Sequence, residues 1–262
     1  MNQHQQTVFV ETSVQIQRIL ASSEQRKQIR EELASPTVLG VSSHYVWMEY
    51  QRTLIADYAH VHDVMGNYMD WGSAFGHILD GQRAFRPRSA VRCTQIISQA
   101  YRAGDQIYEL GRQFLSMQIS HNLRQTFWTH VTPVHDAITC DLVEPGIVRN
   151  SNGSYKVSAS CRKESAACHL PDFLTEQRAK LLVITEYLSA HPRLLKNQVK
   201  VEQLLTGVLQ DPRNALGQTT CWPLGDLIIA LQIPMGAAVW TLDADFIPLV
   251  AALGLQRYQP SP

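Results

Sequence analysis

The chain has 262 residues, which is enough for one large domain or for a core domain that carries a sizeable insertion. Its 23 basic and 23 acidic side chains give a formal net charge of zero. This balance excludes a global positive field, so a nucleic-acid partner would have to meet a local basic patch. Hydrophobic residues make up 45% and charged residues 18%, which is typical of a globular protein.

The sequence predicts no membrane segment and a cytoplasmic location. The N-terminal stretch MNQHQQ is polar and lacks the basic and apolar regions of a secretory signal. The longest apolar run, 227–242, is shorter than the roughly 20 residues needed to cross a bilayer, and it contains Pro234 and Gly236. The five cysteines are an odd number without secretory context and are expected to be thiols of a reducing compartment.

The N-terminal part predicts alternating strands and helices. A short apolar strand covers about 7–10 and is followed by a helix over 13–34, which Pro36 ends. A second strand is expected over 38–41. Ser42 and Ser43 then cap a helix that continues to about Ile55.

The middle of the chain is expected to be mainly helical. The stretch 57–134 has helical character throughout, and two further helices are predicted over 171–190 and 198–210. Between the stretch 57–134 and the helix over 171–190, apolar and polar residues of 139–160 alternate as in strands. They flank an Asn/Ser/Gly cluster at 150–154, which predicts a hairpin.

The C-terminal part returns to an α/β pattern and carries several acids. Asp226 opens an apolar, helix-like run, and a buried strand is expected over 237–240. That strand ends in the sequence TLDAD, which places Asp243 and Asp245 where a strand meets a loop. The first strand similarly ends at Glu11. Since open α/β sheets bind ligands at the carboxyl ends of their strands, these acids are predicted to converge on one metal-binding pocket.

Three segments together resemble a PIN-domain nuclease: VFVETS at 8–13, VSSHYVWMEYQRTL at 41–54 and GDLIIALQIPMGAAVWTLDADF at 225–246. The resemblance implies a PIN-like three-layer α/β/α fold with a parallel sheet, as a single domain over 1–262. The core would be formed by about 1–58 and 221–262. Residues 59–220 would then be a large, mainly helical insertion.

The resemblance also implies a metal-dependent endoribonuclease that hydrolyses phosphodiester bonds, with RNA favoured over DNA as the partner. Its catalytic metal ligands would be Glu11, Glu49, Asp226 and Asp243, with Asp245 as an additional or alternative ligand. Carboxylate oxygens are the ligands that Mg²⁺ and Mn²⁺ prefer, and these ions supply the nucleophilic water and the charge stabilisation of such hydrolysis. Taken singly, each acid is equally consistent with a solvated charge or a helix cap.

Other polar residues are candidates for contacts with the nucleic acid. Ser13 and Thr241 are expected to hydrogen-bond a phosphate, a water or a ligating carboxylate. A run of arginines suits bidentate phosphate binding, although a solvated face is the alternative interpretation. Its members are Arg83, Arg86, Arg88 and Arg92.

One departure from the family pattern opens a second hypothesis. The first acid of PIN domains is usually Asp, whereas Glu11 stands here. The extra methylene moves the carboxylate by more than about 1 Å, because a C–C bond is about 1.5 Å long. Since Mg²⁺ demands strict geometry, a catalytically degenerate domain that binds nucleic acid or protein is the alternative. Self-association of the chain is left open.

Two further sites are weighed. Cys140, Cys161, Cys168 and His169 are suitable ligand types for a structural Zn²⁺, although buried thiols are the competing interpretation. The pairs His62–Asp63 and His135–Asp136 would suit an HD-type phosphohydrolase acting on nucleotides. His44 and Asp80 would then have to complete its metal site.

Overall fold

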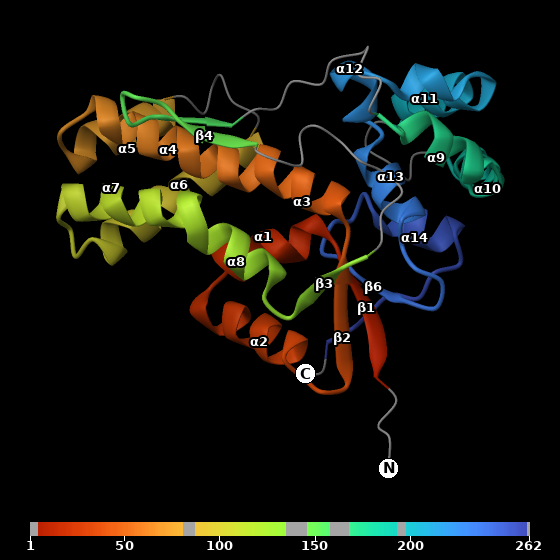
Figure 1. The fold of residues 1–262 in the computed structure, drawn as a ribbon, viewed down its shortest axis with the longest axis horizontal. Coiled ribbons are helices and arrows are strands. Elements are labelled where there is room, and N and C mark those ends of the chain that lie inside the picture. The colour runs from red at the N-terminus through yellow and green to blue at the C-terminus, as the bar shows by residue number, and fades with distance from the viewer. Residues whose placement is uncertain (1–4, 81–86, 135–145, 158–167, 193–197, 261–262) are drawn as a thin grey trace.

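The computed structural model describes residues 5–80, 87–134, 146–157, 168–192 and 198–260 (Figure 1). Among these residues no helix is both long enough and apolar enough to cross a membrane. The arrangement is α/β, with one parallel sheet near the centre of the molecule and helices around it.

The sheet has four strands: β1 (Gln6–Val10), β2 (Val38–Ser42), β3 (Val131–Pro133) and β6 (Ala238–Trp240). Their order is β3-β2-β1-β6, and every neighbouring pair is parallel. The inner strand β1 ends in an apolar run, as expected for a parallel sheet that is covered on both faces. Its last three residues, Val8, Phe9 and Val10, are fully buried.

The path of the chain creates a switch point beside β1. From β1 the chain passes to β2 and β3 on one side, and it returns much later to place β6 on the other side. Val10 and Trp240, the last residues of β1 and β6, lie opposite each other in the register. In open α/β sheets the crevice outside the carboxyl ends of such strands is where ligands bind.

Helices cover both faces of the sheet, which is compatible with the predicted three-layer α/β/α architecture. Val8 and Val10 share a buried cluster with residues of α1 (Thr12–Leu20) and α2 (Ser23–Leu33). Phe9 alternates to the other face and belongs to the larger core that also includes α13 (Gly225–Leu231) and α14 (Ile247–Ala252). Figure 1 shows α1 and α2 on one side of the strands, and α13 and α14 on the other.

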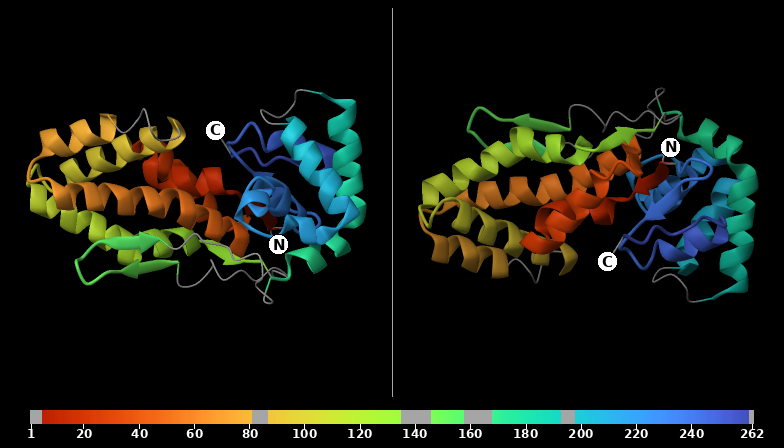
Figure 2. Two further views of the ribbon diagram at one scale, coloured as in Figure 1. Left: turned by 90° about the horizontal axis from the view of Figure 1, so that it is seen from above. Right: turned by 90° about the horizontal axis from the view of Figure 1, so that it is seen from below.

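A long helical body extends from the α1 side of the sheet, as the views from above and below show (Figure 2). It begins with α3 (His44–Tyr50), which runs through a π-helical turn (Gln51–Ile55) into α4 (Ala56–Asn67). The other helices of this body are α5 (Trp71–Asp80), α6 (Pro87–Ala103), α7 (Tyr108–Met117) and α8 (Leu123–Trp128), with a second π-helical turn at Gln118–Asn122.

The remaining elements follow this body along the chain and precede the C-terminal core. The predicted hairpin is confirmed: β4 (Ile147–Arg149) and β5 (Tyr155–Val157) pair antiparallel. On the opposite side of the strands from the helical body lie α9 (Leu170–Glu176), α10 (Arg178–Ala190), α11 (Gln198–Gln210), a 3₁₀ turn (Pro212–Ala215) and α12 (Gln218–Cys221) (Figure 2).

The structure corrects three expectations. The sheet takes a strand, β3, from inside the predicted insertion 59–220, because Val131 pairs beside Gly40 of β2. The predicted helix 13–34 is two helices, since Ala21 is extended and Ser22 caps α2 by accepting from the Gln25 amide. The predicted helix 171–190 is also two, which meet at Gln177.

Candidate functional site

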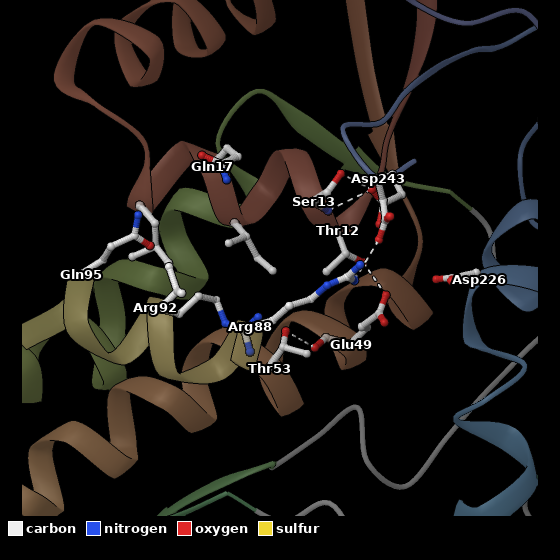
Figure 3. Close-up of a pocket in the computed structure, with 14 residues that line it drawn as sticks. Thr12, Ser13, Gln17, Glu49, Thr53, Arg88, Arg92, Gln95, Asp226 and Asp243 are labelled. Atoms are coloured by element: carbon white, nitrogen blue, oxygen red, sulfur yellow. Dashed lines mark hydrogen bonds and ion pairs between the residues drawn. The ribbon is translucent and has the colours of Figure 1, made fainter. Parts of the chain in front are cut away.

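A cavity of about 420 Å³ opens at the carboxyl ends of β1 and β6 (Figure 3). Its lining comes from both parts of the chain: the predicted core supplies acids and hydroxyls, and α6 supplies one wall. The acids are Glu11, Glu49, Asp226 and Asp243, and α6 contributes Arg88, Val91, Arg92 and Gln95. The structure therefore brings the predicted acids to one place.

Glu11 is fixed by its own strand-to-helix junction. Its backbone N–H donates to the carbonyl of Trp240 at 3.1 Å, and its carboxylate caps α1 by accepting from the Ser13 N–H at 2.9 Å. The hydroxyl of Ser13 also donates to this carboxylate, and Thr241 Oγ1 does so at 3.0 Å. Ser13 and Thr241, which were expected to hydrogen-bond a phosphate, a water or a ligating carboxylate, thus both donate to the carboxylate of Glu11 and orient it.

The environment of Glu11 opposes its ionisation. The residue is only 3% exposed. Burial raises the pKa of its carboxyl to about 7, and the nearby negative charge of Glu49 adds to this rise. The hydrogen bonds from Ser13 and Thr241 act in the opposite direction, because they stabilise the charged form.

Glu49 is held between a hydroxyl and a buried cation. Thr12 Oγ1 donates to Glu49 Oε2 at 2.7 Å, and Arg52 Nη2 lies 3.4 Å from Glu49 Oε1. The Arg52 guanidinium in turn stacks on Trp222, with 5.0 Å between the guanidinium carbon and the ring centroid. Sequence inspection missed Arg52, although its spacing of three residues from Glu49 on a helix was an available signal.

Asp226 lies in the first turn of α13 and reaches the cavity from the side opposite α6 (Figure 3). Burial raises the pKa of its carboxyl to about 8, and the negative charges of Glu49, Glu11, Asp243 and Asp245 follow as further causes. Its carboxylate accepts no hydrogen bond within the described residues. Four other acids are thus close enough to repel it.

Arg88 is the cation that faces these acids. From α6 it extends between Asp243 and Glu49 (Figure 3). Its Nη1 lies 3.6 Å from Asp243 Oδ2, and its Nη2 lies 3.5 Å from Asp245 Oδ2. The backbone N–H of Asp245 donates to Asp243 Oδ1 at 3.0 Å, which ties the two acids together.

The other predicted arginines differ from Arg88. Arg92 lines the cavity, but its guanidinium donates to Asp57 of α4, which also accepts from the Ser89 hydroxyl at 2.6 Å. Arg92 therefore holds α6 against α4. Arg83 and Arg86 lie outside the described residues.

The donor chemistry of the cavity fits a hard divalent cation, because its acids are all carboxylates. Within the described ranges, however, no group of three or more His, Cys, Asp or Glu side chains is close enough together to hold a metal ion. Within the described residues, hydroxyls or arginines instead partner the carboxylates of Glu11, Glu49 and Asp243. A bound ion would require them to move closer together.

The two other predicted sites are not assembled in the described part of the chain. Cys168 is half-buried and His169 Nδ1 lies 3.9 Å from Asp172, whereas Cys140 and Cys161 lie outside the described residues. His62 is buried, and its Nδ1 lies 3.5 Å from Asp63.

The other residues invoked for an HD-type site lie elsewhere. His44 packs edge-on against Trp128 with ring centroids 5.8 Å apart, and Asp80 ends α5. His135 and Asp136 lie outside the described residues. No observation on the described residues favours this class of enzyme.

Comparison of the chain with known protein families, with curated proteins and with solved structures gives no match. The resemblance to PIN domains therefore rests on the quoted segments. What the structure adds is the fold class and the convergence of the acids.

Proposed function

We propose that this chain is a metal-dependent nuclease that hydrolyses phosphodiester bonds, with RNA as the expected substrate. One observation supports it most: four carboxylates from three separate segments of the chain line a single cavity at the switch point of a parallel sheet. They belong to Glu11, Glu49, Asp226 and Asp243. The preference for RNA rests on the resemblance alone.

Different side chains have different roles in the proposed reaction. Mg²⁺ or Mn²⁺, when bound, would activate water and stabilise negative charge at the phosphate. The four carboxylates would hold it, with Asp245 beside them. Thr12 and Arg52 orient Glu49, and Arg88 offers an exposed guanidinium that suits a phosphate group.

The charge distribution gives a reason for a cation at this place. Burial and mutual repulsion raise the pKa values of Glu11 and Asp226, so that ionising them together is costly. A divalent cation among the acids would offset that cost. Such an arrangement is expected of a site that binds a cation, since a purely structural core would place apolar groups there.

The test is cleavage of labelled single-stranded RNA and DNA with Mn²⁺ and with EDTA. The double variant Asp226→Asn/Asp243→Asn should lose cleavage by about 100-fold or more, because several kcal/mol of charge stabilisation disappear. Asp105→Asn/Asp172→Asn is the matched control, since both acids are exposed outside the cavity. Full metal-dependent activity of the first variant would exclude this site.

A degenerate binding module is the second candidate, and two observations favour it. The carboxylate of Glu11 is already occupied by hydroxyl and amide donors, and the described acids form no ready three-ligand group. Such a module should show neither cleavage nor a rise in melting temperature with Mn²⁺. A functional metal site should be stabilised by Mn²⁺ through mass action.

A further inference from the structure

Arg88 occupies an unusual position for a surface arginine. Its side chain is 69% exposed, yet its guanidinium lies 3.6 Å from Asp243 in the cavity lining and 3.5 Å from the adjacent Asp245. It comes from α6, whereas Asp243 and Asp245 follow β6. The contact therefore joins the helical body to the acids of the core.

We propose that Arg88 is an internal counter-cation that competes with the divalent ion for Asp243 and Asp245. In this arrangement α6 sets the metal concentration at which the site fills. The inference rests on the proposed metal-dependent function and adds a means of regulation to the same site. It concerns metal binding, so it can be measured without any cleavage assay.

The geometry of the pair makes it reversible. Both N–O distances exceed the 2.7–2.9 Å that is typical of a charge-assisted hydrogen bond, so the attraction is mainly Coulombic. An exposed ion pair of this kind is weak, because solvent screens its charges. A divalent cation can displace it, but only after overcoming this attraction and the repulsion between the two cations.

Arg88 also differs from its neighbour Arg92 in its ion pairs. Within the described residues its only ion pairs are those with Asp243 and Asp245, whereas Arg92 is paired with Asp57. Substituting Arg88 should therefore leave the attachment of α6 intact. This separates a change in metal affinity from a change in folding.

The experiment is a titration of the full chain with Mn²⁺, with the free ion followed by electron paramagnetic resonance. Arg88→Ala should bind Mn²⁺ about two- to tenfold more tightly than the original chain, since a competing and repelling charge is removed. Arg102→Ala is the matched control, because Arg102 is exposed on the same helix and far from the cavity. It should leave the Kd unchanged.

Ionic strength supplies a second measure. The difference between Arg88→Ala and the original chain should shrink as salt rises, because exposed charges are screened. If Asp243→Asn weakens Mn²⁺ binding while Arg88→Ala leaves it unchanged or weaker, the competition is excluded and the metal site stands. An equal gain in Arg102→Ala would also overturn the competition. If no form of the chain binds Mn²⁺, the competition and the proposed function both fail.

Discussion

Among the acids of the cavity, Asp226 has the carboxyl whose ionisation its surroundings oppose most. Substituting it therefore tests the electrostatics of the site. The N-terminus of α13 favours the charged carboxylate, but burial and four neighbouring acids disfavour it and raise its pKa. A buried charge of this kind lowers the stability of the fold, and a neutral side chain would avoid that cost. The cost can be measured through the pH dependence of stability.

Asp226→Asn should therefore stabilise the chain at high pH when no metal is present. The pKa of the Asp226 carboxyl rises from 3.8 to about 8 on folding, so the folded state binds this proton more tightly than the unfolded state. Stability is then lost as pH rises between those values. The Asn variant should exceed the original chain by on the order of 1–3 kcal/mol at about pH 9 and by little at about pH 4.

Urea unfolding in EDTA across this pH range would measure the effect, with Asp172→Asn as the exposed control. A variant that is less stable than the original chain at high pH would contradict the assigned environment of Asp226. Loss of Mn²⁺-dependent cleavage together with a gain in stability would be the signature of a functional site whose strain serves activity.

Thr12 is predicted to act through Glu49. Thr12→Val removes the hydroxyl that donates to Glu49 Oε2 at 2.7 Å and keeps the shape of the side chain. Removal of a side chain that orients a metal-binding carboxylate typically lowers metal affinity or activity about 10- to 100-fold. We therefore expect at least about tenfold weaker Mn²⁺ binding and slower cleavage.

Thr53→Val is the matched control, because Thr53 lines the same cavity but donates to the backbone carbonyl of Glu49 at 2.6 Å. It should change the Mn²⁺ affinity by less than about threefold, since no carboxylate loses a donor. Equal losses in both variants would show that the hydroxyl of Thr12 has no special role.

At the scale of elements, the sequence predicts best where an apolar run meets an acid. The runs before Glu11 and Asp243 are short, buried and strand-like, and the structure makes them the adjacent strands β1 and β6. Because neighbouring parallel strands end at the same edge, the acids had to meet once this pairing formed. This part of the site follows from the order of residues along the chain.

The elements that were mispredicted had weaker or non-local signals. The break before α2 carries a local signal that was overlooked: Ser22 and Gln25 have the spacing of a capping box. The strand β3 has only three residues, and its position is decided by pairing with β2. Gly40 permits the close approach there, since a Cβ on it would lie 2.5 Å from the carbonyl oxygen of His130.

The contact of Arg88 with Asp243 was beyond sequence reasoning for a related reason. It depends on how α6 packs against the core. Residues 88 and 243 lie far apart in the sequence and in different elements, so no local pattern relates them. The arginine run predicted phosphate contacts. Nothing in it distinguished Arg88, which faces the cavity acids, from Arg92, which is anchored to Asp57.

At the scale of the whole molecule, the cavity has one wall from the core and one from the helical body. The chain has no net charge, so under the proposed function a nucleic-acid substrate would have to be attracted by local arginines such as those on α6. The placement of α6 should therefore matter for activity even at residues that never contact substrate. The buried link between Asp57 and Arg92 is the contact through which this can be tested.

Asp57→Asn should destabilise the chain by on the order of 2 kcal/mol or more, because it leaves the largely buried Arg92 guanidinium without its counter-charge. It should also slow Mn²⁺-dependent cleavage, since α6 would no longer be held in place. Asp57→Asn/Arg92→Met should recover much of the stability, because no unpaired charge remains.

Glu31→Gln is the control: it breaks the exposed pair with Lys27 and should cost less than about 1 kcal/mol. Urea unfolding of the original chain, Asp57→Asn, Arg92→Met and the double variant measures the coupling between the two residues. Additive effects of Asp57 and Arg92 would mean that the link does not hold α6, and that the wall of the cavity is fixed by apolar packing alone.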